Sequence, residues 1–290
     1  MNISIIIPTY NRLESVKLVI TSYLKQDCCE IIFIDDCSTD ETYNYLKSLN
    51  DCRIITYKNK VRMGQQRCRK IGVKLSRYPW IFFGEDDVLL EDNYVSVLYN
   101  EAKLYQASAI AGRLIALYAD NINAINNNLL KINYCITNEN IFDEVHFEGL
   151  FDKLIPKPIL APYLHSIALI NKNCFKNAMF SEIYKGNSWR EETDFYITLN
   201  ELNKKVIFTP SAICYHLRGP WCLVGGNRIN RLYFEYYAFV NTYILYKRKW
   251  NYLKKRLHLS GTPFTNTIKF YLRRQINQLT RILNTYRIFS

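Results

Sequence analysis

Three adjacent carboxylates follow an apolar run in the first third of the chain. Trp80 to Phe83 is apolar, Gly84 breaks the run, and Glu85, Asp86 and Asp87 come next. Like charges at this spacing repel one another, so such a segment needs a compensating partner. A hard divalent cation is the usual one, because it takes oxygen ligands. A solvated acidic turn is the alternative, and the triplet alone does not decide between them.

A second acidic group stands in the last third of the chain. Glu191, Glu192 and Asp194 precede a segment whose apolar residues have helical spacing. Acids in the first turn of a helix interact favourably with its dipole, which is a purely structural explanation. The functional explanation is a general base, because a carboxylate at a helix start that faces a cleft can take a proton from an attacking hydroxyl.

Regular elements must position both groups, and the first 90 residues predict an alternation of strands and helices. Apolar, β-branched runs predict buried strands at residues 3–8, 30–34, 53–57 and 80–83. Helices are expected between them at about 12–25, 38–49 and 64–75. Two capping boxes, Asn11 with Glu14 and Ser38 with Glu41, are expected to begin the first two helices. The pattern predicts an α/β protein with a Rossmann-like, mostly parallel sheet flanked by helices.

Polar residues follow three of these strands where each one ends. They are Thr9-Tyr10, Asp35-Asp36 and the triplet Glu85 to Asp87. Ligands of open parallel sheets bind beyond the carboxyl ends of the strands, so the three segments are expected to converge on one crevice. Neither GxGxxG nor GxxxxGK[ST] is present, so no glycine-rich phosphate cradle is predicted. A cation on the triplet would supply the positive charge that a diphosphate needs.

Composition places the excess positive charge in one region. The net charge is +12, yet no Asp or Glu follows Glu235, while 11 Lys and Arg lie between Lys247 and Arg287. The rest of the chain is nearly neutral. Nine cysteines without a CxxC pair predict reduced thiols in a cytoplasmic setting, and no zinc site. We expect no signal peptide and no membrane-spanning helix.

The second half of the chain carries fewer signals. Residues 91–160, with the Asn-rich stretch 121–128, predict a variable loop or small insertion. His165 either contacts an acceptor or is a core histidine with satisfied hydrogen bonds. Strands are expected at 206–210 and 212–215, the latter ending in His216, and a mobile loop at 219–228.

The C-terminal region predicts a basic helical extension. Residues 232–250 are rich in aromatic side chains, and Pro263 is suited to the first position of a helix. Its apolar face would hold Ile268, Leu272, Ile276, Leu279, Leu283 and Tyr286, and its basic face Lys269, Arg273, Arg274, Arg281 and Arg287. A basic amphipathic helix without acids is typical of membrane-surface elements. Packing on the body or on a partner protein is the alternative, and nucleic acid is not expected as a partner because no binding module is present.

The N-terminal motifs resemble those of family 2 glycosyltransferases, which have the nucleotide-sugar-binding fold called GT-A. The matching residues are Ile5 to Arg12, Ile34 to Thr42, Gly64 with Arg69, and Glu85 to Asp87 at the family's DxD position. The chain departs from the usual pattern at Cys37, where Gly is common, at Lys70, where Asn is common, and at Glu85, where Asp is common. The resemblance is specific over residues 3–90 and returns at 189–216.

The resemblance implies roles for individual residues. Pro8, Thr9, Tyr10 and Arg12 would border the nucleotide, Asp36 would accept a hydrogen bond from its base, and Arg69 would reach the base or the diphosphate. Asp86 would lie near the ribose or sugar. Asp87, with Glu85 and His216, would bind Mg²⁺ or Mn²⁺. Glu192 falls on the family's catalytic base position, and Glu191 is the alternative.

The expected activity is inverting, metal-dependent transfer of a sugar from a nucleotide-diphospho-sugar to an acceptor hydroxyl. A glycan or lipid-linked acceptor would fit an enzyme that is cytoplasmic or peripheral on the cytoplasmic membrane face. We expect a GT-A domain at 1–227, with a nucleotide-binding half at about 1–90 and an acceptor half at about 91–227, followed by the basic helical region 228–290. One alternative is a non-catalytic nucleotide-sugar or glycan-binding module of the same fold. Another is a nucleotidyltransferase, although the Gly-rich signature usual in that class is missing.

Overall fold

A computed structural model describes residues 1–118, 135–218 and 230–288 of the chain. Its main sheet contains strands β1 (Ile3–Thr9), β2 (Glu30–Asp35), β3 (Ile54–Lys58), β4 (Trp80–Phe83), β5 (Val88–Leu90), β6 (Ala109–Tyr118), β9 (Ile159–Leu160), β10 (Leu169–Asn171) and β11 (Val206–Arg218). A small hairpin is formed by β7 (Phe142–Asp143) and β8 (Glu148–Gly149). The helices are α1 (Leu13–Leu24), α2 (Thr42–Ser48), α3 (Gln65–Leu75), α4 (Tyr94–Leu104), the 3-10 helix η1 (Lys172–Lys176), α6 (Glu191–Glu201), α7 (Arg231–Leu257) and α8 (Pro263–Ile288).

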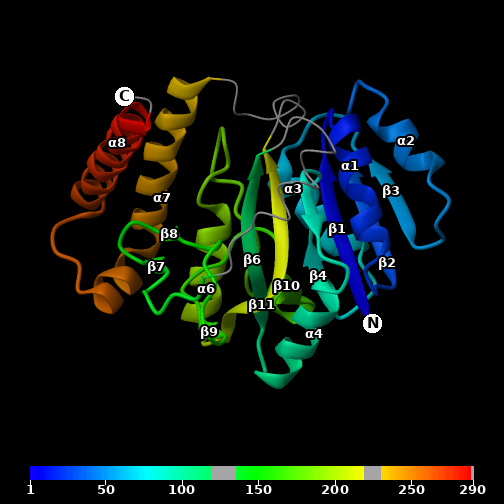
Figure 1. Cartoon of the computed structure of the whole chain (residues 1–290), viewed down its shortest axis with the longest axis horizontal. Coiled ribbons are helices and arrows are strands. Elements are labelled where there is room, and N and C mark those ends of the chain that lie inside the picture. Colours follow the sequence, from blue (N-terminus) through cyan, green and yellow to red (C-terminus); the bar gives the residue numbers. More distant parts are fainter. Residues whose placement is uncertain (119–134, 219–229, 289–290) are drawn as a thin grey trace.

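The sheet has a parallel half and a mixed half (Figure 1). The strand order is β3-β2-β1-β4-β10-β6-β11-β5, and β9 pairs with β11. Strands β3, β2, β1 and β4 are parallel, as predicted from their apolar runs. Antiparallel β10 then lies between β4 and β6, and β11 runs parallel to β6 but antiparallel to β5. The prediction of a mostly parallel sheet flanked by helices is confirmed.

Alternate residues of the strands feed two separate cores. Ile5 and Ile7 of β1 pack with α1, α2 and α4 on one face of the sheet. Ile6 of the same strand packs on the other face, with α3, α6 and α7. Burial on both faces explains why these strands are continuously apolar rather than alternating with polar residues.

The two predicted capping boxes are wrong, because their side chains join two loops instead. The N–H of Asn11 donates to Ser38 Oγ at 2.9 Å, and Asn11 Oδ1 accepts from the N–H of Thr39 at 2.8 Å. Helices α1 and α2 begin without a side-chain cap from either residue. The loops that follow β1 and β2 are therefore fixed to each other at the edge where the site lies.

Residues 91–160 are more regular than predicted. They contain α4 and the ten-residue strand β6, which lies between β10 and β11 in the sheet. The loop prediction is wrong there, and residues 121–128 lie outside the described residues. The two strands expected at 206–215 form the single strand β11, with a register shift against β6 between Phe208 and Ile213.

Helices α7 and α8 lie side by side at one end of the molecule (Figure 1). Leu245, Tyr246 and Leu253 of α7 are buried in the second core, so this helix packs on the body. The boundary expected at residue 227 lies in the segment outside the described residues, as does the loop expected at 219–228. None of the described helices combines the length and apolar character needed to cross a membrane.

The irregular part of the β6–β11 pairing yields a prediction about stability. A Cβ atom at Gly112 of β6 would lie 2.3 Å from the backbone oxygen of Ala212. We expect Gly112→Ala to reduce the free energy of unfolding by about 1–3 kcal/mol, because backbone atoms must move to relieve the overlap. Urea unfolding of this variant and of Asn100→Ala, an exposed control on α4, measures it. Equal midpoints for the two variants would contradict the assigned close approach.

Candidate active site

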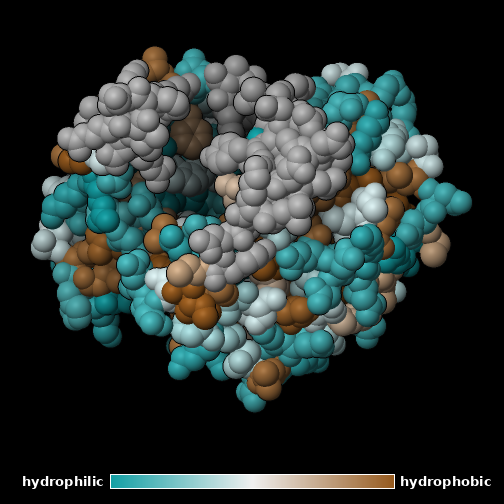
Figure 2. Space-filling view, in the orientation of Figure 1, coloured by the Kyte–Doolittle hydropathy of each residue, from teal (hydrophilic) through white to brown (hydrophobic). Residues whose placement is uncertain are grey.

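A cleft of about 1040 Å³ opens at the carboxyl ends of the parallel strands. The space-filling view shows this hollow between the C-terminal helices and the strands (Figure 2). Among the residues proposed above from sequence, the cleft is lined by Pro8, Thr9, Tyr10, Arg12, Asp36, Glu85, Asp86, Asp87, Glu192 and His216. Arg69 and Glu191 are not among its lining residues. Segments distant in sequence therefore meet in one cleft, as expected from the positions of the strand ends.

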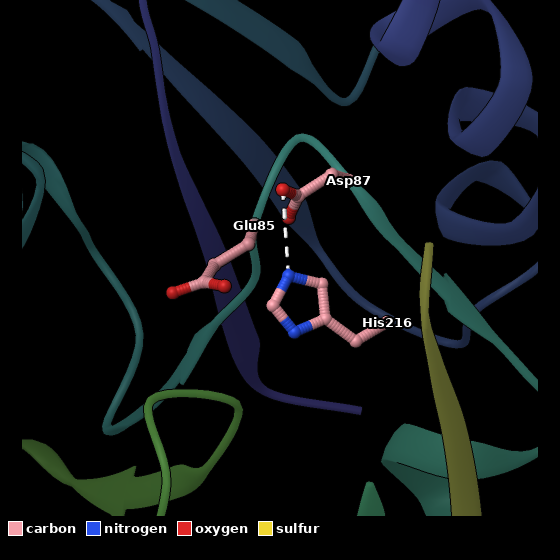
Figure 3. Close-up of side chains that lie close together, drawn as sticks. All are labelled: Glu85, Asp87 and His216. Atoms are coloured by element: carbon pink, nitrogen blue, oxygen red, sulfur yellow. Dashed lines mark ion pairs between the residues drawn. The ribbon is translucent and has the colours of Figure 1, made fainter. Parts of the chain in front are cut away.

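Glu85, Asp87 and His216 come together on one side of the cleft (Figure 3). Their potential ligand atoms all lie within 4.8 Å of one another. The register of β5 against β11 pairs Val88 with His216 and thereby sets the imidazole beside Asp87. His216 Nε2 lies 3.4 Å from Asp87 Oδ2, but this buried nitrogen makes no hydrogen bond. A buried nitrogen without a donor or acceptor partner, next to two carboxylates, fits a site for a divalent cation.

The acidic turn that carries these ligands is fixed by α1. The Tyr23 hydroxyl accepts from the Glu85 N–H at 3.0 Å and donates to the Glu85 carbonyl at 2.9 Å. Ser15 donates to the carbonyl of Asp86 at 2.5 Å. A Cβ atom at Gly84 would lie 2.6 Å from the Tyr23 ring, so glycine lets the turn approach the helix. Hydrogen bonds to α1 thus hold the backbone that carries these carboxylates.

Negative charge is concentrated at this turn. Burial first, and then the charge of Asp87, raise the pKa of Asp86 to about 7, although Arg12 and Thr9 act in the opposite direction. The contribution of Asp87 reflects repulsion between neighbouring carboxylates, which nearby positive charge would relieve. The donor set of two carboxylates and one imidazole suits Mn²⁺ and, less well, Mg²⁺. The residues present therefore fit the cation expected from the sequence.

Asp36 holds the segment that leads into α3. Its Oδ1 accepts from the Met63 N–H and from Asn59 Nδ2, both at 2.8 Å, and its Oδ2 accepts from the Gly64 N–H at 2.7 Å. Gly64 has φ 89°, a conformation that favours glycine. Asp36 is also one of the residues that line the cleft.

Arg69 lies beneath the cleft and not in it. Its Nη1 donates to Glu191 at 2.5 Å and to Glu192 at 2.8 Å, and its Nη2 donates to Glu85 at 3.4 Å. Burial alone would lower the pKa of Arg69, but the charges of Glu192, Glu191 and Glu85 raise it above its ordinary value. The expected contact with the base or the diphosphate stays a prediction, and in the structure α6 brings its two glutamates to this guanidinium. Arg69 instead connects the acidic turn to the start of α6.

Glu191 and Glu192 are neighbours with different surroundings. The Glu191 side chain is 1% exposed, and burial, followed by the charge of Glu192, raises its pKa well above the ordinary value. The Glu192 side chain is 23% exposed and lines the cleft. Between the two positions weighed for a base, only that of Glu192 gives access to a substrate.

The start of α6 is anchored by the preceding residue, Arg190. It has φ 82°, which turns its side chain into the protein, where it is 2% exposed. The guanidinium donates to the Phe147 carbonyl at 2.8 Å and to Thr242 of α7 at 3.1 Å, and lies over the Trp189 ring at 4.2 Å. The C-terminal helices therefore help to position the segment that presents Glu192.

His165 is a core residue. Its Nε2 is 2.8 Å from the Gly112 carbonyl, and its Nδ1 accepts from the Ile167 N–H at 3.2 Å. Nε2 therefore carries the proton and donates. Burial lowers the pKa of His165 to about 4. Of the two interpretations of His165, acceptor contact or core histidine, the structure supports the core histidine.

Several residues that line the cleft were not among the candidates chosen from the sequence. They are Arg62, Met63, Gln65, Gln66, Arg67, Glu182, Tyr184, Lys185, Trp189, Arg218 and Phe234. Arg62 lies over the Tyr10 ring at 4.2 Å, and Arg67 pairs with Glu182 at 2.7 Å. The one available signal was Trp189, an aromatic residue directly before the second acidic group. Glu182 and Tyr184 lie in the cleft because their segment contacts Arg67 and Gln66 of α3.

The Arg69 cluster yields a prediction about stability and pH. Arg69→Met leaves buried carboxylates without their cation, so we expect a loss of about 3–5 kcal/mol at neutral pH. Where folding raises the pKa of a carboxyl group, the free energy of unfolding falls as pH rises through that pKa. Removing Arg69 raises the pKa of Glu191 further, which strengthens this effect. The deficit against wild type should therefore be smaller at about pH 5 than at about pH 8. Urea unfolding at both pH values measures it, and a pH-independent deficit would contradict the proposed charge cluster.

Comparisons with known sequences agree with the geometry. The chain is 33% identical over 125 residues to the poly(ribitol-phosphate) beta-N-acetylglucosaminyltransferase TarP of Staphylococcus aureus, which covers 38% of this chain and 36% of that protein. It is 34% identical over 87 residues to the UDP-Glc:alpha-D-GlcNAc-diphosphoundecaprenol beta-1,3-glucosyltransferase WfaP of Escherichia coli, covering 29% and 35%. The matched regions thus span about a third of the length of these relatives.

Solved structures share the fold at low sequence identity. Staphylococcus aureus TarS 1-349 in complex with UDP-GlcNAc has a TM-score of 0.56 at 15% identity, covering 75% of this chain and 59% of that one. GalNAc-T7 with UDP, GalNAc and Mn²⁺ has a TM-score of 0.60 at 15% identity, covering 74% and 43%. Both neighbours are glycosyltransferases, and the shared fold is GT-A. The sequence model of glycosyl transferase family 2 matches residues 4–160, more than half of the 290 residues, and the chain belongs to that family.

Proposed function

We propose that this protein is an inverting glycosyltransferase that moves a sugar from a nucleotide-diphospho-sugar to an acceptor hydroxyl with the help of a divalent cation. One observation carries the proposal: Glu85, Asp87 and His216 share a cleft with the accessible carboxylate of Glu192. A cation site for a diphosphate and a base for a hydroxyl are the two groups that the reaction needs.

The donor is proposed to lie along the ends of β1, β2 and β4. Pro8, Thr9 and Tyr10 border the nucleotide, Arg12 and Asp86 lie toward the ribose or sugar, and Asp36 accepts a hydrogen bond from the base. These residues all line the cleft. A UDP-sugar is the first donor to test, because the structural neighbour TarS binds UDP-GlcNAc.

Glu192 is proposed as the general base. Its carboxylate takes the proton of the acceptor hydroxyl while that oxygen forms a bond to the anomeric carbon. The bond from this carbon to the diphosphate oxygen breaks in the same displacement, and the electron pair leaves with the nucleoside diphosphate. Attack on the face opposite the leaving group inverts the configuration. Arg69 keeps the carboxylate in place from below, at 2.8 Å.

Glu85, Asp87 and His216 would hold Mg²⁺ or Mn²⁺. When bound there, the cation supplies positive charge to the departing diphosphate. GalNAc-T7, which shares the fold, was solved with Mn²⁺ and UDP. Arg62 and Lys185 line the same cleft and add positive charge to it.

The acceptor is proposed to be a glycan or a lipid-linked glycan. TarP is named for action on poly(ribitol-phosphate) and WfaP for action on GlcNAc-diphosphoundecaprenol. The volume of the cleft, about 1040 Å³, is at the upper end for small-molecule sites and leaves room for an acceptor beside the donor.

A donor screen tests the proposed function. The protein is incubated with UDP-, GDP- and dTDP-sugars with Mn²⁺ or with EDTA, and free nucleoside diphosphate is measured. We expect slow release from one donor, loss of release with EDTA, and loss in Asp87→Asn, which removes a ligand charge without changing side-chain size. Thermal shift by a nucleotide without any release, also when candidate acceptors are added, would favour the non-catalytic binding module instead.

The assignment of the base yields a further prediction. Glu192→Gln should lower the rate of transfer by about 10²–10⁴-fold and leave the donor Kd nearly unchanged, because the proton acceptor is lost but not the donor site. Glu201→Gln is the matched control, since it makes the same change at the far end of α6. Transfer rates and donor titrations measure both effects. If Glu191→Gln lost transfer and Glu192→Gln kept it, the base would be Glu191.

A further inference from the structure

Helix α8 packs on the protein through a face that is not its most apolar one. Asn266, Thr267 and Phe270 are buried, and Arg274 pairs with Glu235 of α7 at 2.8 Å. This side of α8 also carries Tyr271, whose ring contacts Phe239 of α7. The described part of α8 therefore packs on the body, as in the alternative considered for the sequence, but through a face other than its apolar stripe.

Apart from Phe264, whose ring contacts Phe239 and Tyr243 of α7, the apolar stripe of α8 faces away from the body. Its described members repeat at three- or four-residue spacing and are exposed: Phe264 53%, Ile268 37%, Leu272 57%, Ile276 62% and Leu279 60%. Residues at this spacing lie on one side of a helix. The side chains of Leu283 and Tyr286, expected on the same face, lie outside the described ones. Soluble proteins rarely expose a contiguous apolar row of this length without a partner for it.

The first turns of α7 extend this surface toward the cleft. Leu232 and Tyr236 are 82% and 62% exposed. Glu235 stands between them and pairs with Arg274, so these turns lie beside the second half of α8. Phe234, in the same turn, lines the cleft. The exposed apolar surface is thus adjacent to the candidate active site.

The charged residues of α8 itself are all basic. Lys269 and Arg273 are exposed beside it, Arg273 also pairing with Asp143, and no acidic residue follows Glu235 anywhere in the sequence. A second copy of the chain would bring the same basic helix against this one, and the like charges would repel. An anionic bilayer complements both the apolar stripe and the flanking cations.

We propose that α8, with the first turns of α7, docks on the surface of an anionic lipid bilayer. The stripe from Phe264 to Leu279 enters the headgroup region, and the helix axis lies along the membrane plane. The helix stands outermost at its end of the molecule, which leaves this approach open (Figure 1). Docking brings the mouth of the cleft close to the lipid headgroups. This proposal does not depend on the assigned chemistry of the cleft.

Vesicle flotation of the full chain tests the docking surface. We expect binding to vesicles of phosphatidylcholine with phosphatidylglycerol, little binding to phosphatidylcholine alone, and weaker binding as NaCl rises from about 0.1 M to about 0.5 M. Leu272→Glu with Ile276→Glu should weaken the partition coefficient by about tenfold or more, because both side chains would carry charge into the interface. Both positions are exposed, so folding is expected to be retained, and circular dichroism checks it.

The matched control changes charge without changing the stripe. Asn251→Glu with Asn277→Glu alters the net charge equally at exposed polar positions of α7 and α8, and should bind clearly better than the stripe variant. Equal losses in the two double variants would overturn the proposal, because binding would then follow charge alone. A dimer of the full chain that dissociates in the stripe variant would also overturn it, in favour of self-association. Nucleoside diphosphate release without vesicles should be the same in both double variants, which separates this result from the proposed function.

Discussion

The buried guanidinium of Arg69 joins the two acidic groups on which the site is built. It contacts Glu85 in the turn after β4 and both Glu191 and Glu192 at the start of α6. Without this cation, the approach of these carboxylates would be electrostatically unfavourable in a buried setting. One helix, α3, therefore sets the distance between the cation ligands and the accessible carboxylate of Glu192. The geometry of the cleft depends on this arrangement more than on any single lining residue.

Much of the parallel half of the fold could be predicted from local pattern. Strand β4 has the predicted bounds, 80–83, because four buried apolar residues are followed by glycine and acids. The second half could not be predicted in this way. Strand β6 contains Gly112 and Arg113 in its interior, so it gives no clear strand pattern, and β10 has only three residues. Their places in the sheet are set by pairings between distant segments.

The residues of the site also divide into predictable and unpredictable ones. Residues at strand ends, such as Asp36 and Asp87, line the cleft because the fold brings these ends together. The ion pairs of Arg69 were not predictable, since they depend on how α6 approaches α3. Residues such as Lys185 and Phe234 enter the cleft from segments without a motif, so the side of the cleft that faces the C-terminal helices was not predictable.

The position of β11 has a consequence for how the protein is made. This strand, residues 206–218, supplies His216 and holds β5 and β6 in the sheet. The acidic turn is synthesised long before β11. Strands β5 and β6 therefore leave the ribosome before the strand with which they both pair. Assembly of the mixed half must wait for pairing across a long loop, which is a slow step in folding. The parallel half is complete by residue 83 and can form earlier, as a platform on which the rest of the sheet is built.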